Sequence, residues 1–167
     1  DKRNLLPGIL LAFLGGLSCK DIRVRVEGAV SLPHRMEEVR EFNGIRFIND
    51  SAATMPDATV VALQALSGEK IIHIIGGNDK NLEWNVWAKE ESKANIKEMI
   101  WLPGDATSLM KAGYEKVRGR VKGKDARSMK EAVEMAVQVA QKGDVILLSP
   151  GATSFGLFRN EFDRGDV

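Results

Sequence analysis

The sequence predicts an α/β fold: a mostly parallel sheet with helices on both faces. Residues 71–75 and 145–148 are almost entirely apolar, as expected of parallel strands that are covered on both faces. Strand-like and helix-like segments alternate from about residue 45 onward, which is the order that builds a parallel sheet. Polar residues and glycines follow four of the strand-like runs, where open α/β sheets bind their ligands.

The composition is that of a globular protein without a dominant charge. The 167 residues are 44% hydrophobic and 28% charged, and this length suits one domain with a modest extension. There are 24 basic and 23 acidic residues, so the chain has no large overall positive charge that would attract nucleic acid or an anionic membrane. We expect neither as a partner. Cys19 is the single cysteine; it cannot form an internal disulfide, and we interpret it as a small, semi-buried residue.

The first 31 residues are predicted to be helical and separate from the sheet. Residues 5–17 are strongly apolar, but the run is too short to span a bilayer and has no cleavage-like end, so we predict a buried helix. Ile22, Val26 and Val30 recur at four-residue spacing, which predicts a second short helix. Pro33 interrupts the pattern, and we place a domain boundary near Leu32, giving segments 1–31 and 32–167.

The order of elements after the boundary follows from local patterns. Residues 37–42 and 45–48 read as two strands around an Asn-Gly turn. Strands are predicted at 45–49, 70–75, 99–102, 118–121 and 144–149, and helices at 56–66, 86–96, 107–112 and 128–141. Pro56 suits a first helical turn, and Ser128 with Glu131 forms a capping box that opens the last helix.

The strand ends predict a site for a small anion. Small, hydroxyl-bearing and charged residues occupy positions 49–54, 76–80, 103–105 and 149–154, and the carboxyl ends of parallel strands meet at one edge of a sheet. Small residues allow close backbone approach, free N–H groups bind carboxylate or phosphate, and a lysine adds a point charge. Turn formation alone also explains such residues, but four similar loops at one edge favour a site.

Other signals for chemistry are weaker. No GxxxxGK[ST] or GxGxxG motif occurs, so neither a P-loop nor a nicotinamide fingerprint is present. His34 and His73 do not form a metal pair with Cys19, and His73, inside an apolar strand, is predicted to be a core histidine. Ser154 has no visible triad context. Arg35 is read as a phosphate or ring contact, or as a solvated domain-edge arginine.

Two clusters of large or basic residues have structural explanations. Trp84 and Trp87 lie three apart; core packing explains them better than an exposed ligand shelf does. Residues 116–124 are rich in lysine and arginine, and an edge strand with a charged face explains this run without nucleic acid.

The motifs resemble those of the Mur ligases. Residues 34–37 (His-Arg-Met-Glu), 43–44 (Asn-Gly) and 49–54 (Asn-Asp-Ser-Ala-Ala-Thr) look like the start of the C-terminal domain of that family. Residues 76–80, and 148–154 with Phe158 and the 160–165 tail, agree in order and spacing. The element at 49–54 resembles the D-glutamate-adding type more than its sister ligases, and the resemblance spans essentially the whole chain.

The resemblance implies part of a three-domain ligase. Residues 1–31 would end the central ATPase domain, and 32–167 would be the C-terminal amino-acid-binding domain with a dinucleotide-binding-like fold. The chain begins with Asp1 and stops at Val167, so we expect it to be a piece of a longer, monomeric, cytoplasmic protein of cell-wall synthesis and to be inactive alone.

The implied reaction joins D-glutamate to UDP-N-acetylmuramoyl-L-alanine through an acyl phosphate, with ATP and Mg²⁺ bound mainly outside this chain. The residues implied to hold the D-glutamate carboxylates are Thr54, Lys80 and Ser154. The residues implied to contact ATP are Asn4, Arg35 and Asp50. Neither a catalytic residue nor a metal ligand is implied within this chain.

Two departures and two alternatives stand beside this interpretation. Ala52 occupies a position where the family usually has lysine, and Glu161 stands where an aromatic residue is usual, with Phe162 following. We hypothesise that these changes relax amino-acid selectivity toward a cationic substrate such as D-lysine, with D-glutamate the default. The alternatives are another Mur-type ligase, such as a folylpolyglutamate synthase, and a non-catalytic nucleotide- or amino-acid-binding module.

Overall fold

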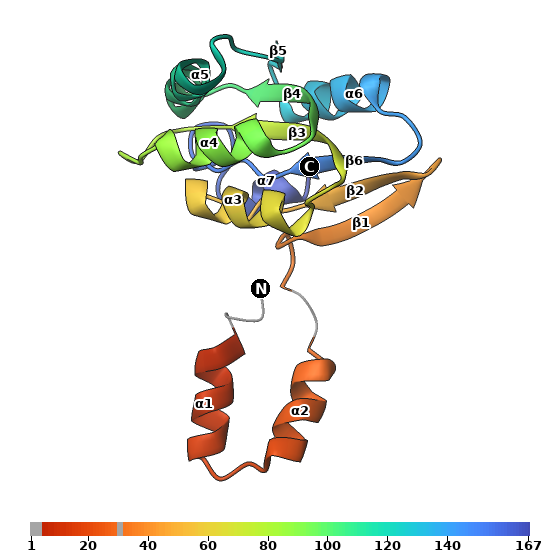
Figure 1. The fold of residues 1–167 in the computed structure, drawn as a ribbon, viewed down its shortest axis with the longest axis vertical. Helices are drawn as coiled ribbons and strands as arrows, with labels where there is room; N and C mark the ends of the chain where they lie inside the picture. Colours follow the sequence, from red (N-terminus) through yellow and green to blue (C-terminus); the bar gives the residue numbers. More distant parts are fainter. Residues whose placement is uncertain (1–4, 30–31) are drawn as a thin grey trace. The chain divides into compact units, whose positions relative to one another are not determined.

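The computed structural model describes residues 5–29 and 32–167 and contains two compact units, Asp1–Ser31 and Leu32–Val167. The first holds two helices, and the second holds the sheet with the remaining helices (Figure 1). Among the described residues, no helix combines the length and apolar character that crossing a bilayer requires.

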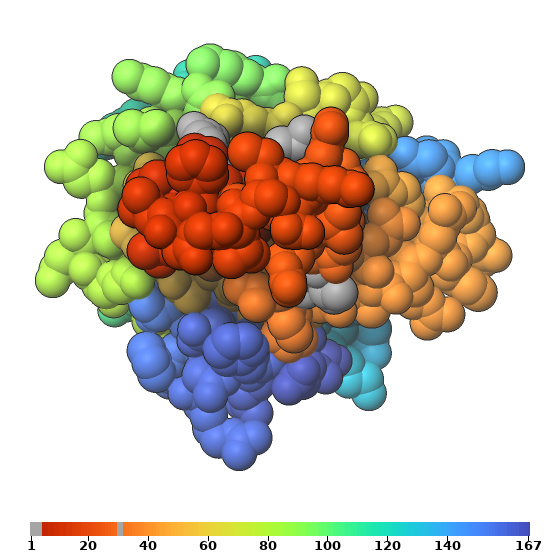
Figure 2. Space-filling view, turned by 90° about the horizontal axis from the view of Figure 1, so that it is seen from below, coloured from red at the N-terminus to blue at the C-terminus, as the bar shows by residue number. Residues whose placement is uncertain are grey.

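The first unit consists of α1 (Leu6–Leu14) and α2 (Cys19–Glu27). Ser18 caps α2 by accepting a hydrogen bond from the Asp21 amide (3.2 Å). The prediction of a buried first helix is wrong, because α1 has no buried residue and its side chains lie on the surface (Figure 2). Two nine-residue helices are too small a unit to cover a helix on all sides. Cys19 is exposed, not semi-buried as predicted.

The second unit is built on a six-stranded sheet of order β1-β2-β6-β3-β4-β5. Its strands are β1 (Glu37–Phe42), β2 (Ile45–Asn49), β3 (Lys70–Gly76), β4 (Ile96–Leu102), β5 (Lys124–Asp125) and β6 (Asp144–Leu148). The β1–β2 pair is antiparallel and every other pair is parallel. Asn43 and Gly44 both have positive φ, 54° and 73°, as the predicted Asn-Gly turn requires. The predicted fold class is therefore confirmed.

Helices cover the two faces of this sheet unequally. They are α3 (Pro56–Ala65), α4 (Asn85–Lys93), α5 (Asp105–Arg118), α6 (Met129–Val139) and α7 (Glu161–Gly165). Because side chains alternate along a strand, Ile72 and Ile74 pack in the cluster with α6, while Ile71 and Ile75 pack in the clusters with α3, α4 and α5.

Several predicted boundaries shift. Ile96 begins β4 instead of ending a helix. The predicted strand at residues 118–121 is wrong, because α5 continues through Arg118 and ends at Gly119 in the left-handed conformation (φ 74°). Trp84 and Trp87 are 6% and 0% exposed, which confirms that they pack in the core.

Candidate functional site at the carboxyl edge of the sheet

Backbone hydrogen bonds join the loops that follow β2, β3 and β6. Asn78 and Thr153 form an isolated antiparallel bridge, with an N–O distance of 3.0 Å in each direction. The Thr153 hydroxyl also donates to the Asn78 carbonyl (2.9 Å), and the Gly151 amide donates to the Ala53 carbonyl (2.9 Å). Three loops that are distant in sequence are thus held at one edge.

Two glycines permit the close approach of these loops. Gly77 and Gly104 have φ values of 142° and 143°. A Cβ on Gly77 would lie 2.4 Å from the Thr153 carbonyl oxygen, and one on Gly104 would lie 2.0 Å from the Gly77 carbonyl oxygen. The Asp79 amide donates to the Asp105 carboxylate (2.6 Å), so the β3 loop is also tied to the start of α5. Backbone contact of this kind excludes any side chain at the two glycines.

The three residues predicted to hold D-glutamate lie in these joined loops. Thr54 is half-buried, Lys80 is exposed and Ser154 is 4% exposed. Each is one or two residues from a backbone hydrogen bond that links two loops. The structure brings their loops together, as the sheet topology predicted, and their role in binding stays a prediction.

Of the three residues predicted to contact ATP, Asp50 and Arg35 are described and Asn4 lies outside the described residues. Asp50 is 5% exposed and accepts hydrogen bonds from the Met36 amide (3.1 Å) and the Ser149 hydroxyl (2.7 Å). Burial raises the pKa of the Asp50 carboxyl, although both hydrogen bonds and the charge of exposed Arg35 oppose the shift. Arg35 therefore lies near enough to act on Asp50 electrostatically.

A buried arginine, which the sequence did not single out, locks two of the loops. Arg164 is 1% exposed; it donates to the Ser51 hydroxyl (3.0 Å), the Ser51 carbonyl (2.8 Å) and the Ala152 carbonyl (3.0 Å). Burial lowers its pKa to about 10, against the opposing effect of Glu161, so it remains charged at neutral pH. No local signal distinguishes it from exposed Arg159 in the same tail.

The C-terminal tail also docks on a histidine at the start of the second unit. The Asn49 amide lies 2.9 Å from His34 Nδ1 and donates to the Gly165 carbonyl (2.9 Å). The other ring nitrogen, Nε2, lies 3.1 Å from the Asp166 carboxylate. A Cβ on Gly165 would lie 2.5 Å from the His34 ring, so the contact needs glycine there.

A buried polar chain connects α4 to the site. His73 and Glu91 are each 0% exposed; His73 Nδ1 lies 2.7 Å from Glu91 Oε1, and Nε2 lies 3.0 Å from the Ser149 carbonyl oxygen. Both ring nitrogens face acceptors, so an imidazolium that donates to both fits the geometry. Burial acts to lower the pKa of His73, but Glu91 and the Ser149 carbonyl outweigh it and the pKa is raised. The prediction of a core histidine is confirmed; its partner was not predicted.

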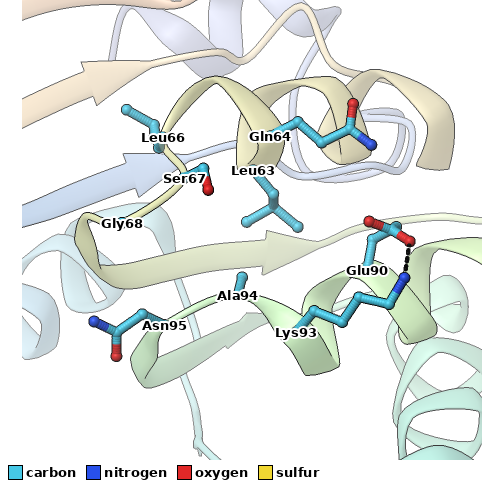
Figure 3. A pocket seen from close by; sticks show the side chains of 9 residues that line it. All are labelled: Leu63, Gln64, Leu66, Ser67, Gly68, Glu90, Lys93, Ala94 and Asn95. Atoms are coloured by element: carbon cyan, nitrogen blue, oxygen red, sulfur yellow. Dashed lines mark hydrogen bonds and ion pairs between the residues drawn. The ribbon is translucent and has the colours of Figure 1, made fainter.

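A separate pocket lies at the opposite edge of the sheet, beside Gly68 and Asn95, which precede β3 and β4. Its volume is about 310 Å³, and Figure 3 shows the side chains that line it. Its two charged side chains, Glu90 and Lys93, pair with each other at 2.7 Å, so they leave little net charge for a ligand. Within residues 5–29 and 32–167, no three His, Cys, Asp or Glu side chains gather as a metal site would need.

Similarity to characterised proteins bears on this site directly. The chain is 38% identical over 168 residues to the UDP-N-acetylmuramoylalanine–D-glutamate ligase of Roseiflexus sp., covering 98% of this chain and 35% of that protein. It is 34% identical over 166 residues to the ligase of the same name from Myxococcus xanthus, covering 99% and 35%. The chain thus spans about a third of the length of these relatives.

Solved structures share the fold at lower identity. The UDP-N-acetylmuramate–alanine ligase of Thermotoga maritima superimposes with a TM-score of 0.64 at 19% identity, covering 86% of this chain and 32% of that one. A bifunctional folylpolyglutamate synthase/dihydrofolate synthase from Yersinia pestis gives a TM-score of 0.62 at 21% identity, covering 81% and 32%.

The family match includes most of the residues that build the carboxyl edge. Residues 34–151 match the family described as "Mur ligase, glutamate ligase domain", and this range includes the loops after β2, β3 and β4. The chain therefore belongs to the Mur ligase family.

Proposed function

We propose that the chain is the amino-acid-binding part of an ATP-dependent ligase that adds D-glutamate to UDP-N-acetylmuramoyl-L-alanine in peptidoglycan precursor synthesis. The observation that carries the proposal is the convergence of the motif-bearing loops at one strand edge, in a chain 38% identical to a D-glutamate ligase. Because the chain spans 35% of that relative, the proposed activity is that of a longer parent protein.

Lys80, Thr54 and Ser154 are proposed to bind the two carboxylates of D-glutamate. Exposed Lys80 supplies a mobile positive charge, and the two hydroxyls supply hydrogen-bond donors from neighbouring loops. Bound in this way, D-glutamate would present its amine to an acyl phosphate on the acceptor substrate. Such positioning lowers a barrier by roughly 7–11 kcal/mol when the geometry is good, so these residues need to orient the substrate and not transfer protons.

The nucleotide contacts proposed for this chain are modest. Each Asp50 carboxylate oxygen accepts one hydrogen bond and keeps a further lone pair for a ribose hydroxyl. Exposed Arg35 can approach the base, and Asn4 is proposed to lie near the adenine. The described residues offer no cluster of metal-ligating side chains, so we propose that the magnesium ion and the triphosphate are held by the rest of the parent protein.

The amino-acid specificity is a separate question from the family. Ala52 leaves one lysine fewer than the resembling ligases carry, and Glu161 adds an acid close by, since its carbonyl accepts the Ser51 hydroxyl (2.7 Å). Arg164, which donates to the same Ser51 hydroxyl, keeps a positive charge at this edge. We therefore retain D-glutamate as the substrate and use D-lysine as the competing substrate in the test.

The experiment is phosphate release by the full-length parent with UDP-N-acetylmuramoyl-L-alanine, ATP and Mg²⁺. D-Glutamate is expected to support release and D-lysine is not. Lys80→Ala should raise the KM for D-glutamate about tenfold, or ~1.4 kcal/mol, because it removes a positive charge proposed to pair with the carboxylates. Lys89→Ala, an exposed lysine on α4, is the matched control and should leave KM unchanged.

Each alternative has its own result when phosphate release is measured with this acceptor and, in a parallel reaction, with a folate acceptor and L-glutamate. A folded parent that releases no phosphate with either amino acid would favour the non-catalytic binding module. Release that depends on a folate acceptor and L-glutamate would favour a folylpolyglutamate synthase. D-Glutamate-dependent release that is equal in the Lys80 and Lys89 variants would keep the ligase and remove Lys80 from its site.

A further inference from the structure

A second polar pocket lies at the amino end of β4, across the sheet from the candidate site. Its volume is about 320 Å³, near the lower limit of ordinary ligand pockets. It is lined by Ala94, Ile96, Tyr114, Arg118, Arg120 and Lys122. Three of these six residues are basic and none is acidic. Three basic residues of the run noted in the sequence therefore line a cavity. The predicted edge strand with a charged face is reduced to β5, which contains only the last basic residue of the run, Lys124.

Among the described residues, no carboxylate forms an ion pair with the three basic side chains of this pocket. In the part of the chain that the structure describes, ion pairs engage other basic residues and none of Arg118, Arg120 and Lys122. The neighbouring pocket differs in this respect, because its Lys93 is paired with Glu90 at 2.7 Å (Figure 3). Positive charge is thus concentrated in the pocket beside Ile96.

Hydrogen bonds hold the donors of this pocket in place. Lys122 Nζ donates to the Ile96 carbonyl (2.9 Å), and Arg118 donates to the Ser92 carbonyl. Tyr114, which is 4% exposed, also lines the pocket, and burial raises the pKa of its hydroxyl. A guanidinium has five N–H donors, so these bonds leave others for a ligand.

Compensation of a helix dipole accounts for one of the three charges. Arg118 lies in the last turn of α5, where a cation interacts favourably with the helix C-terminus. Gly119 then ends the helix with φ 74°. Arg120 and Lys122 lie beyond the helix and still line the pocket, so two positive charges have no such explanation.

We propose that this pocket binds a phosphate group, either as inorganic phosphate or as the phosphomonoester end of a small metabolite. Three cations suit a doubly charged phosphate better than they suit a singly charged carboxylate. The two parallel N–H groups of a guanidinium also match two oxygens of a tetrahedral anion. The Tyr114 hydroxyl adds a neutral donor. The pocket shares no residue with the proposed ligase site, so this proposal stands or falls independently of the proposed function.

Calorimetric and NMR titrations of the 167-residue chain test the proposal, with inorganic phosphate and phenyl phosphate as separate probes at constant ionic strength. Saturable binding of at least one probe is expected, with shifts at the amides of Tyr114 to Lys122. Arg120→Gln should weaken binding about tenfold, and Lys122→Gln is a second variant of the same kind. Lys116→Gln removes the same charge from an exposed position of α5 that does not line the pocket, and should change affinity less than twofold.

The two probes also identify the source of the phosphate group. Binding of inorganic phosphate assigns a site for the free anion, and binding of phenyl phosphate alone assigns a site for esters. No saturation with either probe would overturn the proposal. Equal weakening in the Arg120 and Lys116 variants would also overturn it, because that result describes a diffuse field and not a site. Thermal unfolding curves establish that each variant is folded.

Discussion

Replacement of Glu91 tests the buried ion pair between α4 and β3. Glu91 Oε1 lies 2.7 Å from His73 Nδ1, and both side chains are 0% exposed. Glu91→Leu leaves a buried imidazole without its partner, and loss of one partner of a buried pair costs about 3–5 kcal/mol. Glu91→Gln keeps the shape, and its amide can donate to Nδ1 of a neutral imidazole whose Nε2–H still reaches the Ser149 carbonyl. We expect that variant to lose roughly 1–3 kcal/mol.

The pH dependence of stability separates the two variants from the wild type. The pKa of His73 is raised from its ordinary 6.5, so the folded chain holds a proton that the unfolded chain releases. This stabilisation is complete below pH 6.5 and is lost as the pH rises through the folded pKa, with a slope approaching about 1.4 kcal/mol per pH unit. In Glu91→Gln, burial favours the neutral imidazole, and the slope should vanish or reverse.

Urea unfolding followed by tryptophan fluorescence between pH 6 and 9 measures this effect. Asp50 also titrates near His73, and its pKa is raised from the ordinary 3.8. The stabilisation that comes from protonated Asp50 is therefore present at acid pH and is lost as the pH rises through the raised pKa. Glu83→Gln, at an exposed position just before α4, is the control. An unchanged slope in Glu91→Gln would refute the charged pair, as would wild-type stability in Glu91→Leu.

Three further predictions concern the loops and the sheet. Gly104→Ala should cost ~3 kcal/mol or more, because its Cβ would meet a backbone oxygen at 2.0 Å, while Gly68→Ala, with open space around it, should cost about 1 kcal/mol; denaturant titrations compare them. Arg164→Met should lower stability by about 2–4 kcal/mol through three lost hydrogen bonds, and increase proteolysis of the tail. Arg159→Met, which removes only an exposed ion pair with Asp163 (2.7 Å), should lower stability by less than about 1 kcal/mol. The pKa of Asp144 is lowered, since its hydrogen bonds to Lys97 and the Gln141 amide outweigh the effect of burial. Its stabilisation is present above its ordinary pKa of 3.8 and is lost as the pH falls through the lowered pKa, so Asp144→Asn should raise the acid-unfolding midpoint.

The elements that local patterns predicted were mostly found where expected. The apolar runs at 71–75 and 145–148 became central parallel strands, and Ser128 caps α6 by accepting from the Glu131 amide (3.2 Å). The errors fall where a local pattern is ambiguous. Alternating basic and small residues at 118–121 suggested a strand, although the first of them completes α5 and a left-handed glycine then redirects the chain.

The candidate site was predictable in outline because all parallel strands place their following loops at the same edge. Thr54, Lys80 and Ser154 lie in loops that the Asn78–Thr153 bridge and the bond from Gly151 to Ala53 hold together. The individual hydrogen bonds between these loops were not predictable, because they depend on backbone atoms whose positions are set by the packing of whole strands.

The sequence alone determined the α/β class, the hairpin, the meeting of the polar loops at one edge of the sheet and the family resemblance. These follow from periodicity, turn residues and motif order, which act over a few neighbouring residues. Only the tertiary structure decided that Arg164 would be buried against Ser51, that His73 would meet Glu91, and that three residues of the basic run would line a pocket. Each of these depends on residues far apart in the chain, or on where an element ends, and such contacts form only when the sheet and helices pack.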